Sequence, residues 1–273
     1  MRIRSCSILL ALVLTPMANA QSSSDSATYA LRWRTDALML GGSLALAGTG
    51  VLVRGSQEPI PENTIGSLRT TSVNAFDRQV FDLIGDRRTA LRNSDMVVGL
   101  TVAAPLLLGL DKKVREEWKP LLVMYAETMM LNTGIQNWTS HLTDRYRPIT
   151  YVTDAPMNER MDNVNHNSFY SGHTSATAAA SFFTASVIVD LHPELGWKRW
   201  LVYSAAVVPP AMAGYYRMQA GKHFPTDVIT GAIAGAAVGT LVPAIHRNHW
   251  GTGLTVIPCF GDDFTGCSIG LRW

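Results

Sequence analysis

The sequence has few charged residues and few cysteines, and both shortages narrow the range of functions. Charged residues make up 16% of the 273 residues, hydrophobic residues make up 47%, and the formal net charge is +2. This composition excludes a long disordered tail and a nucleic-acid partner, which would need a basic patch. No spacing of the three cysteines and seven histidines resembles a zinc site, so we expect no metal. The low charge content instead indicates a membrane-associated or deeply buried helical protein.

The first twenty residues have the pattern of a secretory signal peptide, with an apolar run over residues 8–14 and Ala18-Asn19-Ala20 as the cleavage site. We expect export, with an uncut membrane anchor as the alternative. Cys259 and Cys267 would then remain, in a Gly-rich tail where residues 254–260 and 265–273 predict a hairpin. An oxidising compartment favours a disulfide between them, and two free thiols are the alternative.

Six long apolar segments predict an all-α fold, because strand signals are nearly absent before residue 254. The segments cover residues 37–53, 96–110, 120–138, 174–189, 200–216 and 228–245. They are about 15 to 19 residues long, at or below the short end of a bilayer span, and too apolar for surface helices. We therefore expect a membrane-embedded bundle of about six core helices. The domain order is signal peptide (1–20), apolar segment and loop (21–95), catalytic helical core (96–246) and tail (247–273).

Three further features of the sequence predict how individual helices pack. Gly231, Gly235 and Gly239 recur every four residues, which permits close packing of a membrane helix. Glu127 is the one charged residue in the third segment, so it should face the bundle interior and make a buried structural hydrogen bond. Residues 76–84 predict a short amphipathic helix.

Polar residues gather in three clusters, at residues 144–148, 167–175 and 214–228. The first follows the third apolar segment, the second precedes the fourth, and the third lies between the fifth and the sixth. Because successive helices of a bundle run in opposite directions, all three clusters should lie at the same end. That end is the expected site.

The side chains of these clusters suit an anion. Ser171, Gly172 and His173 stand where a helix begins, and its free backbone N–H groups and positive dipole end attract negative charge. Arg147 and Arg217 are planar, permanently charged groups that match phosphate oxygens. Each arginine alone is more often a surface residue, so it is their convergence that predicts a phosphate site.

Two histidines supply the reactive groups. His223 and Asp227 are four residues apart, a spacing at which the carboxylate can fix the imidazole tautomer and leave the other nitrogen free to attack phosphorus. The alternative for Asp227 is a first-turn helix charge. His173 can donate a proton to the leaving oxygen. This set suits phosphoryl transfer without a metal, since that chemistry is mostly positioning and charge stabilisation.

The arrangement resembles the type 2 phosphatidic acid phosphatase (PAP2) superfamily, whose three motifs are Lys-x6-Arg-Pro, Pro-Ser-Gly-His and Ser-Arg-x5-His-x3-Asp. The end of the first motif matches Arg147-Pro148 and the core of the second matches Ser171-Gly172-His173. The third matches in its full spacing, at Arg217, His223 and Asp227. The resemblance covers roughly residues 96–246 by helix order.

The resemblance implies a helical fold of the acid phosphatase and haloperoxidase type, no cofactor, and a residue-by-residue mechanism. His223 would form a phosphohistidine, Asp227 would orient it, and His173 would be the general acid. Arg147, Arg217, Ser171 and Gly172 would hold the phosphate. The implied partners are a lipid phosphate or diphosphate and the membrane lipids around it; the oligomeric state stays open. Alternatives are a soluble periplasmic acid phosphatase, a vanadium haloperoxidase and an inactive binding protein.

The chain departs from the motifs at three positions. Ser140 replaces the lysine of the first motif, and we expect Arg145 to supply the missing charge and bind phosphate. Tyr170 replaces the proline of the second motif and Tyr216 the serine of the third. The other histidines match no motif and are interpreted as surface or loop residues: His141, His166, His192, His246 and His249.

The membrane orientation is predicted in two conflicting ways. A cleaved signal followed by three spans would put the site in the cytoplasm. Basic residues lie instead in the loops opposite the site, at residues 112–119 and 198–199, and basic loops stay inside. We expect an inner-membrane enzyme whose site faces the periplasm. Either the first apolar segment does not cross, or the signal is not cleaved, or the protein is a soluble bundle.

Overall fold

The computed structural model describes residues 27–248 and two strands of the tail, so the expected signal peptide lies outside the described residues. The elements are α1 (Trp33–Gly55), α2 (Glu62–Ser67), η1 (Thr70–Ser72), α3 (Ala75–Arg78), α4 (Val80–Leu83), α5 (Arg87–Ala103), η2 (Ala104–Leu110), α6 (Lys112–Glu116), α7 (Trp118–Thr143), η3 (Pro148–Tyr151), α8 (Met157–Arg160), η4 (Asn163–His166), α9 (Gly172–Leu191), η5 (Pro193–Lys198), α10 (Arg199–Ala206), α11 (Val208–Gln219), α12 (Pro225–His246), β1 (Gly253–Gly261) and β2 (Phe264–Arg272).

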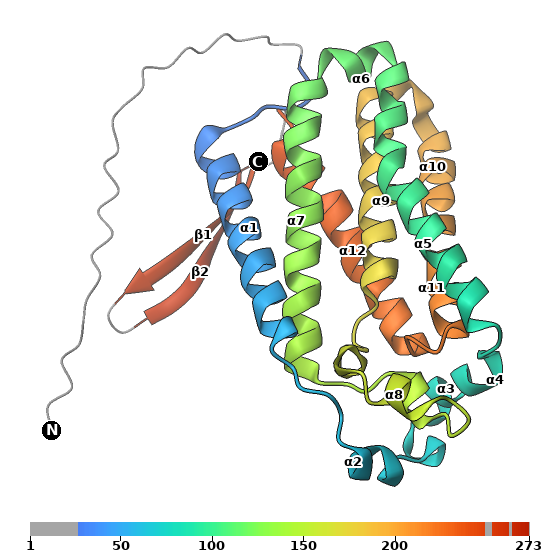
Figure 1. Ribbon diagram of the computed structural model, residues 1–273. Coiled ribbons are helices and arrows are strands. Elements are labelled where there is room, and N and C mark those ends of the chain that lie inside the picture. Colours follow the sequence, from blue (N-terminus) through green and yellow to red (C-terminus); the bar gives the residue numbers. More distant parts are fainter. Residues whose placement is uncertain (1–26, 249–252, 262–263, 273) are drawn as a thin grey trace, which may run out of the picture.

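The long helices form a bundle around α9 (Figure 1). Helix α9 packs against α5, α7, α10, α11 and α12, while α1 lies along the outer side of α7. The six predicted segments correspond to α1, α5 with η2, α7, α9, α10 with α11, and α12. The prediction of an all-α bundle with about six core helices is confirmed.

Two segments that were each predicted as a single helix form two helices in the structure. The fifth segment divides at Val207 into α10 and α11, because Pro209 and Pro210 lack the N–H groups that would continue α10 and instead occupy the first turn of α11. Residues 76–84 form two single turns, α3 and α4. The first is capped by Asn74, whose side chain accepts a hydrogen bond from the backbone N–H of Asp77.

Glycines let the principal helices approach closely. A Cβ atom on Gly235 or Gly239 of α12 would overlap a backbone carbonyl of α9, so the predicted glycine face is confirmed as a packing face. Gly134 does the same for α7, since a Cβ there would lie 2.9 Å from the backbone nitrogen of Ala47 in α1. This contact holds α1 against α7 and fixes where the end of α1 lies.

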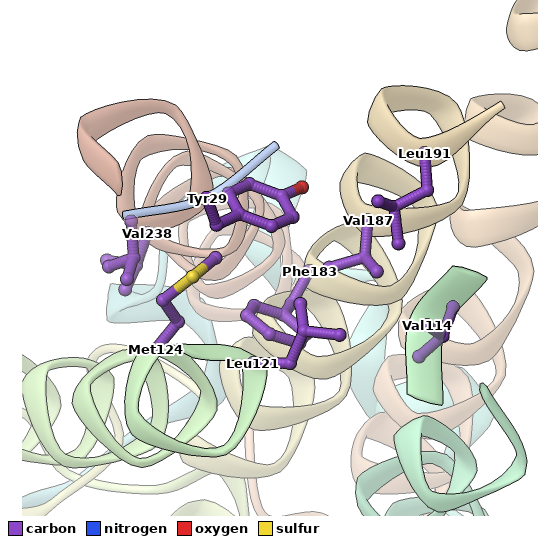
Figure 2. Packing of buried hydrophobic residues seen from close by; sticks show 9 residues of the cluster. Tyr29, Val114, Leu121, Met124, Phe183, Val187, Leu191 and Val238 are labelled. Atoms are coloured by element: carbon purple, nitrogen blue, oxygen red, sulfur yellow. The ribbon is translucent and has the colours of Figure 1, made fainter. Parts of the chain in front are cut away.

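The interior and the exterior of the bundle are both apolar. Figure 2 shows part of the core, where Met124 of α7, Phe183 of α9 and Val238 of α12 pack together. Large side chains such as Leu38, Leu100 and others along α5, α10 and α12 are exposed. Among the described residues four helices are long and apolar enough to cross a membrane: α1, α5 with η2, α9 and α12. An apolar exterior on such helices is typical of a bundle embedded in a membrane.

The tail forms the predicted hairpin, with β1 and β2 paired antiparallel. The register places Cys259 opposite Gly266 and Cys267 opposite Pro258, so the two cysteines are not partners across the ladder. Their side chains lie outside the described residues. The disulfide between Cys259 and Cys267 therefore stays a prediction.

Candidate active site

All three polar clusters lie at one end of the bundle. Helix α7 ends there, α9 begins there, and the turn from α11 to α12 lies beside them (Figure 1). The side chains surround a cavity of about 250 Å³. It is lined by Arg54, Asn132, Thr133, Gln136, Asn137, Arg147, Asn167, Gly172, His173, Ala176, Arg217 and His223. Four of the residues predicted from the motifs to hold phosphate or react with it thus share one cavity with Gly172.

His223 is buried at the cavity with a fixed orientation. Its Nδ1 atom donates a hydrogen bond of 2.7 Å to the backbone carbonyl of Ser168. A carbonyl only accepts, so Nδ1 carries the proton and Nε2 keeps its lone pair. Burial, with the positive charges of Arg147 and Arg217, holds the pKa of His223 well below its ordinary value. At neutral pH the imidazole is therefore uncharged and nucleophilic.

Asp227 contacts His223 less directly than the spacing predicts. Its Oδ2 atom is 3.9 Å from Nδ1 of His223, beyond hydrogen-bond distance. The same carboxylate accepts hydrogen bonds of 2.6 Å from the hydroxyl of Ser168 and 2.8 Å from the backbone N–H of Phe224. Asp227 therefore holds Ser168, and the carbonyl of Ser168 orients His223. The role of Ser168 could not be read from the motifs, because it acts through its backbone.

Arg145 occupies a different place from the one expected. Its guanidinium pairs with Asp227 at 2.5 Å and with Asp77 at 2.7 Å, and lies 4.3 Å from the centre of the Phe224 ring. It is not among the residues that line the cavity. The structure corrects the phosphate-binding expectation: two carboxylates already use this cation, and it supports the Asp227 network instead.

His173 stands in the first turn of α9 and lines the cavity. Its Nε2 atom is 3.0 Å from Oδ1 of Asp95, a residue of α5 that no motif identified. The carboxylate of Asp95 fixes the orientation of the imidazole ring at the cavity.

Arg147 and Arg217 are both 6% exposed, and the Nε atom of each lacks a hydrogen-bond partner. Neither guanidinium forms a salt bridge within residues 27–248. Burial and the charges of Arg217 and Arg54 lower the pKa of Arg147 to about 9. Two buried cations without a carboxylate are costly unless an anion joins them. The cavity is thus built to receive negative charge.

Two residues of the second motif, Ser171 and Gly172, lie in different places relative to the cavity. Ser171 is fully buried and caps α9, accepting a hydrogen bond from the backbone N–H of Thr174, and it does not line the cavity. Gly172 does line it, and a Cβ there would lie 3.1 Å from Cδ of Gln136. The absence of a side chain at Gly172 leaves the N-terminal N–H groups of α9 accessible to an anion.

Arg54 is a third arginine at the cavity, and sequence reasoning missed it. It belongs to the last turn of α1, and its Nη1 atom donates a 3.1 Å hydrogen bond to Oδ1 of Asn137. Ser140, at the place of the motif lysine, is fully buried and accepts a 2.7 Å hydrogen bond from Gln136. No local pattern connects Arg54 with residue 140, because only the packing of α1 on α7 brings it to the site.

The chain is similar to known proteins over part of its length. Residues 121–250 match the family model described as the PAP2 superfamily. Over this stretch the chain is similar to the PAP2 superfamily. The matched stretch begins in α7 and contains all three motifs.

One relative of the chain is phosphatidylglycerophosphatase B of Bacillus subtilis (strain 168), which is 26% identical over 130 residues. The match covers 47% of this chain and 58% of that protein's length. Among solved structures, the crystal structure of the first transmembrane PAP2-type phosphatidylglycerolphosphate phosphatase from Bacillus subtilis is 20% identical, with a TM-score of 0.45. That comparison covers 74% of this chain and 94% of the other.

Proposed function

We propose that this protein is a phosphatase that removes a terminal phosphate from a lipid through a phosphohistidine on His223. The observation that carries the proposal is the cavity in which an oriented, uncharged His223 meets the buried guanidiniums of Arg147 and Arg217. A neutral imidazole nucleophile beside unpaired cations is suited to attack a phosphate dianion.

In the first step, Nε2 of His223 attacks phosphorus and the bond from phosphorus to the lipid oxygen breaks. The electron pair of that bond goes to the leaving oxygen, and protonated His173 donates its proton there. Arg147 and Arg217 stabilise the charge on the transferred phosphoryl oxygens. The products are the dephosphorylated lipid and phosphohistidine.

In the second step, water attacks the phosphohistidine. Neutral His173 takes a proton from the water, the bond from phosphorus to nitrogen breaks, and its electron pair returns to Nε2 of His223. Phosphate leaves, and both histidines are back in their starting states. No step requires a metal ion.

Arg54 completes the phosphate cradle in place of the motif lysine. Ser140 carries no charge, and Arg145 is held by two carboxylates. Arg54 lines the cavity and is close enough to lower the pKa of Arg147. We therefore assign to Arg54 the third positive charge at the phosphate.

A lipid substrate fits the setting of the cavity. Four helices of the described chain are apolar and long enough to span a bilayer, so a lipid tail could stay in the membrane while its head group reaches His223. A phosphatidylglycerol phosphate is the first candidate, since a relative is named for that activity. Undecaprenyl diphosphate, phosphatidic acid and lipid A are the others to test.

We also propose that the cavity faces the periplasm. The basic residues Lys112, Lys113 and Arg115 lie in and beside α6, at the end of the bundle opposite the cavity. Basic segments remain on the cytoplasmic side. Helix α1 packs along α7, which disfavours the possibility that the first apolar segment does not cross. An impermeant maleimide should label Asn63→Cys but not Lys112→Cys in intact cells, with the three native cysteines changed to serine; the reverse pattern would contradict the orientation.

Phosphate release tests the function. The purified full-length protein in detergent is given each of the four lipids, with p-nitrophenyl phosphate as a soluble comparison. We expect one lipid to be hydrolysed much faster than the soluble ester, and His223→Ala to abolish release. Equal activity of wild type and His223→Ala would contradict the mechanism, and a preference for the soluble ester would favour a non-specific acid phosphatase.

A further inference from the structure

A second group of ionisable side chains lies inside the bundle, at the end opposite the cavity. Asp36 comes from the first turn of α1, Glu127 from α7 and His246 from the last turn of α12. One ligand atom from each lies within 4.8 Å of the others. Nε2 of His246 is 3.0 Å from Oδ1 of Asp36 and 3.2 Å from Oε2 of Glu127. The three residues are 8%, 0% and 2% exposed in that order.

The tautomer of His246 is set by its own helix. Nδ1 lies 2.9 Å from the backbone carbonyl of Val242, which can only accept a hydrogen bond. Nδ1 therefore carries a proton. Nε2 faces both carboxylates, so it either donates a second proton to Asp36 or, in a neutral imidazole, offers its lone pair to a cation held between them. A histidine whose second nitrogen donates to a carbonyl is the usual arrangement of a metal ligand.

The carboxylates have no lysine or arginine partner among the described residues, and His246 can compensate only one of the two charges. Neither oxygen of Glu127 has a hydrogen-bond partner, although the side chain is fully buried. No Lys or Arg within residues 27–248 forms a salt bridge with Asp36 or Glu127. Buried carboxylates are costly unless a cation or a proton joins them.

We propose that Asp36, Glu127 and His246 bind a divalent transition-metal cation such as Zn²⁺. Two carboxylates and one imidazole are ligands that Zn²⁺ accepts, at about 2.0 to 2.2 Å, which places tetrahedral ligand atoms about 3.3 Å apart. The observed separations of 3.0 and 3.2 Å need to grow by only a few tenths of an ångström. The site ties α1 to α7 and α12, so the cation would stabilise the bundle.

The competing explanation is a proton shared among the three groups without any metal, and a cobalt titration distinguishes the two. The full-length protein in detergent, with Cys6, Cys259 and Cys267 changed to serine, is stripped of metal and titrated with Co²⁺. We expect one bound equivalent with the visible absorption of a four- or five-coordinate site. Zn²⁺ should displace it and raise the melting temperature.

Variants locate the ion. Glu127→Gln keeps the shape of the side chain and should abolish Co²⁺ binding and the Zn²⁺ effect on melting; His246→Gln should do the same. The matched control is His192→Gln, because His192 contacts Asp111 at 3.0 Å on the surface near the same end of the bundle. Failure of wild type to bind Co²⁺, or retention of binding in Glu127→Gln or His246→Gln, would overturn the proposal. The titration of wild type alone can refute the proposed metal site, so the test does not depend on whether every variant folds.

Discussion

The two ends of the bundle present the same imidazole geometry in opposite electrostatic surroundings. His223 and His246 are both 2% exposed, and in each the Nδ1 proton is held by a backbone carbonyl. The cavity that His223 lines also contains the guanidiniums of Arg147 and Arg217, whereas Nε2 of His246 faces the carboxylates of Asp36 and Glu127. The two proposals therefore give the same side chain different roles: attack on an anion at one end and binding of a cation at the other. The neighbours decide the function of the histidine.

The largest expected effect comes from removing a guanidinium at the His223 end. Arg147→Gln should lower kcat/KM for lipid-phosphate hydrolysis about 100- to 1,000-fold, because one charged donor to the transition state is lost. Unfolding of the variant should require as much denaturant as wild type or more, since a buried charge without a carboxylate is removed. Glu127→Gln is the counterpart at the other end and should leave kcat/KM unchanged where the protein is folded. If Glu127→Gln lost as much activity as Arg147→Gln, the two ends would not be separate sites.

A smaller loss is expected from Arg54, the cation supplied by α1. Arg54→Ala should lower kcat/KM about 10- to 100-fold, the value of one or two charge-assisted hydrogen bonds. Arg54→Lys should keep most of the activity, because charge rather than shape is what replaces the motif lysine. Arg69→Ala, in the loop before η1, is the control for loss of an arginine. Unchanged kinetics of Arg54→Ala would remove Arg54 from the proposed cradle.

Asp227 contacts His223 through Ser168, so substitutions of Asp227 and Ser168 should lower kcat by different amounts. Asp227→Asn should lower kcat about 10- to 100-fold, because the negative charge that holds Ser168 and pairs with Arg145 is lost. Ser168→Ala should lose less, since the orienting carbonyl of Ser168 is kept. A larger loss in Ser168→Ala than in Asp227→Asn would show that the hydroxyl has another role.

The smallest expected effect is a change in pH dependence. In the proposed mechanism His223 reacts in its neutral form, and its pKa lies well below the ordinary value because of burial and the nearby arginines. Activity should therefore persist as the pH falls below 6 and decline only when His223 becomes protonated. Arg217→Gln removes a positive charge, so protonation becomes easier and the acid limb of kcat/KM should move to higher pH. Arg217→Lys keeps the charge and should leave the limb in place.

Local sequence patterns were sufficient for the helices and for the residues within the motifs. The apolar segments predicted six core helices, and the glycines of α12 predicted its packing face. The spacing of Arg217 and His223, with the helix order, predicted that they would meet Arg147 and His173 at one cavity. These predictions succeeded because helical periodicity and the alternation of helix direction are local properties.

Contacts between distant segments could not be predicted in this way. Arg54 reaches the cavity only because Gly134 allows α1 to approach α7. Asp95 of α5 contacts His173 of α9, a neighbouring helix that is distant in sequence. Arg145 was expected at the phosphate, but Asp77 and Asp227 hold it. His246 was interpreted as a surface or loop residue, and that was wrong, because it is buried beside Glu127. The interior position of Glu127 was predicted correctly, but the hydrogen bond expected of it is not formed. Pairing of charges depends on which helices become neighbours.

In the proposed mechanism His223 carries the phosphoryl group during the reaction. The most direct measurement is rapid acid-free denaturation of the enzyme during turnover of a ³²P-labelled lipid phosphate, followed by mapping of the label. We predict an alkali-stable, acid-labile phosphate on the peptide that contains His223 in wild type, and none in His223→Ala. Turnover of the lipid without any labelled enzyme, or label on another residue, would show that His223 is not the phosphoryl carrier.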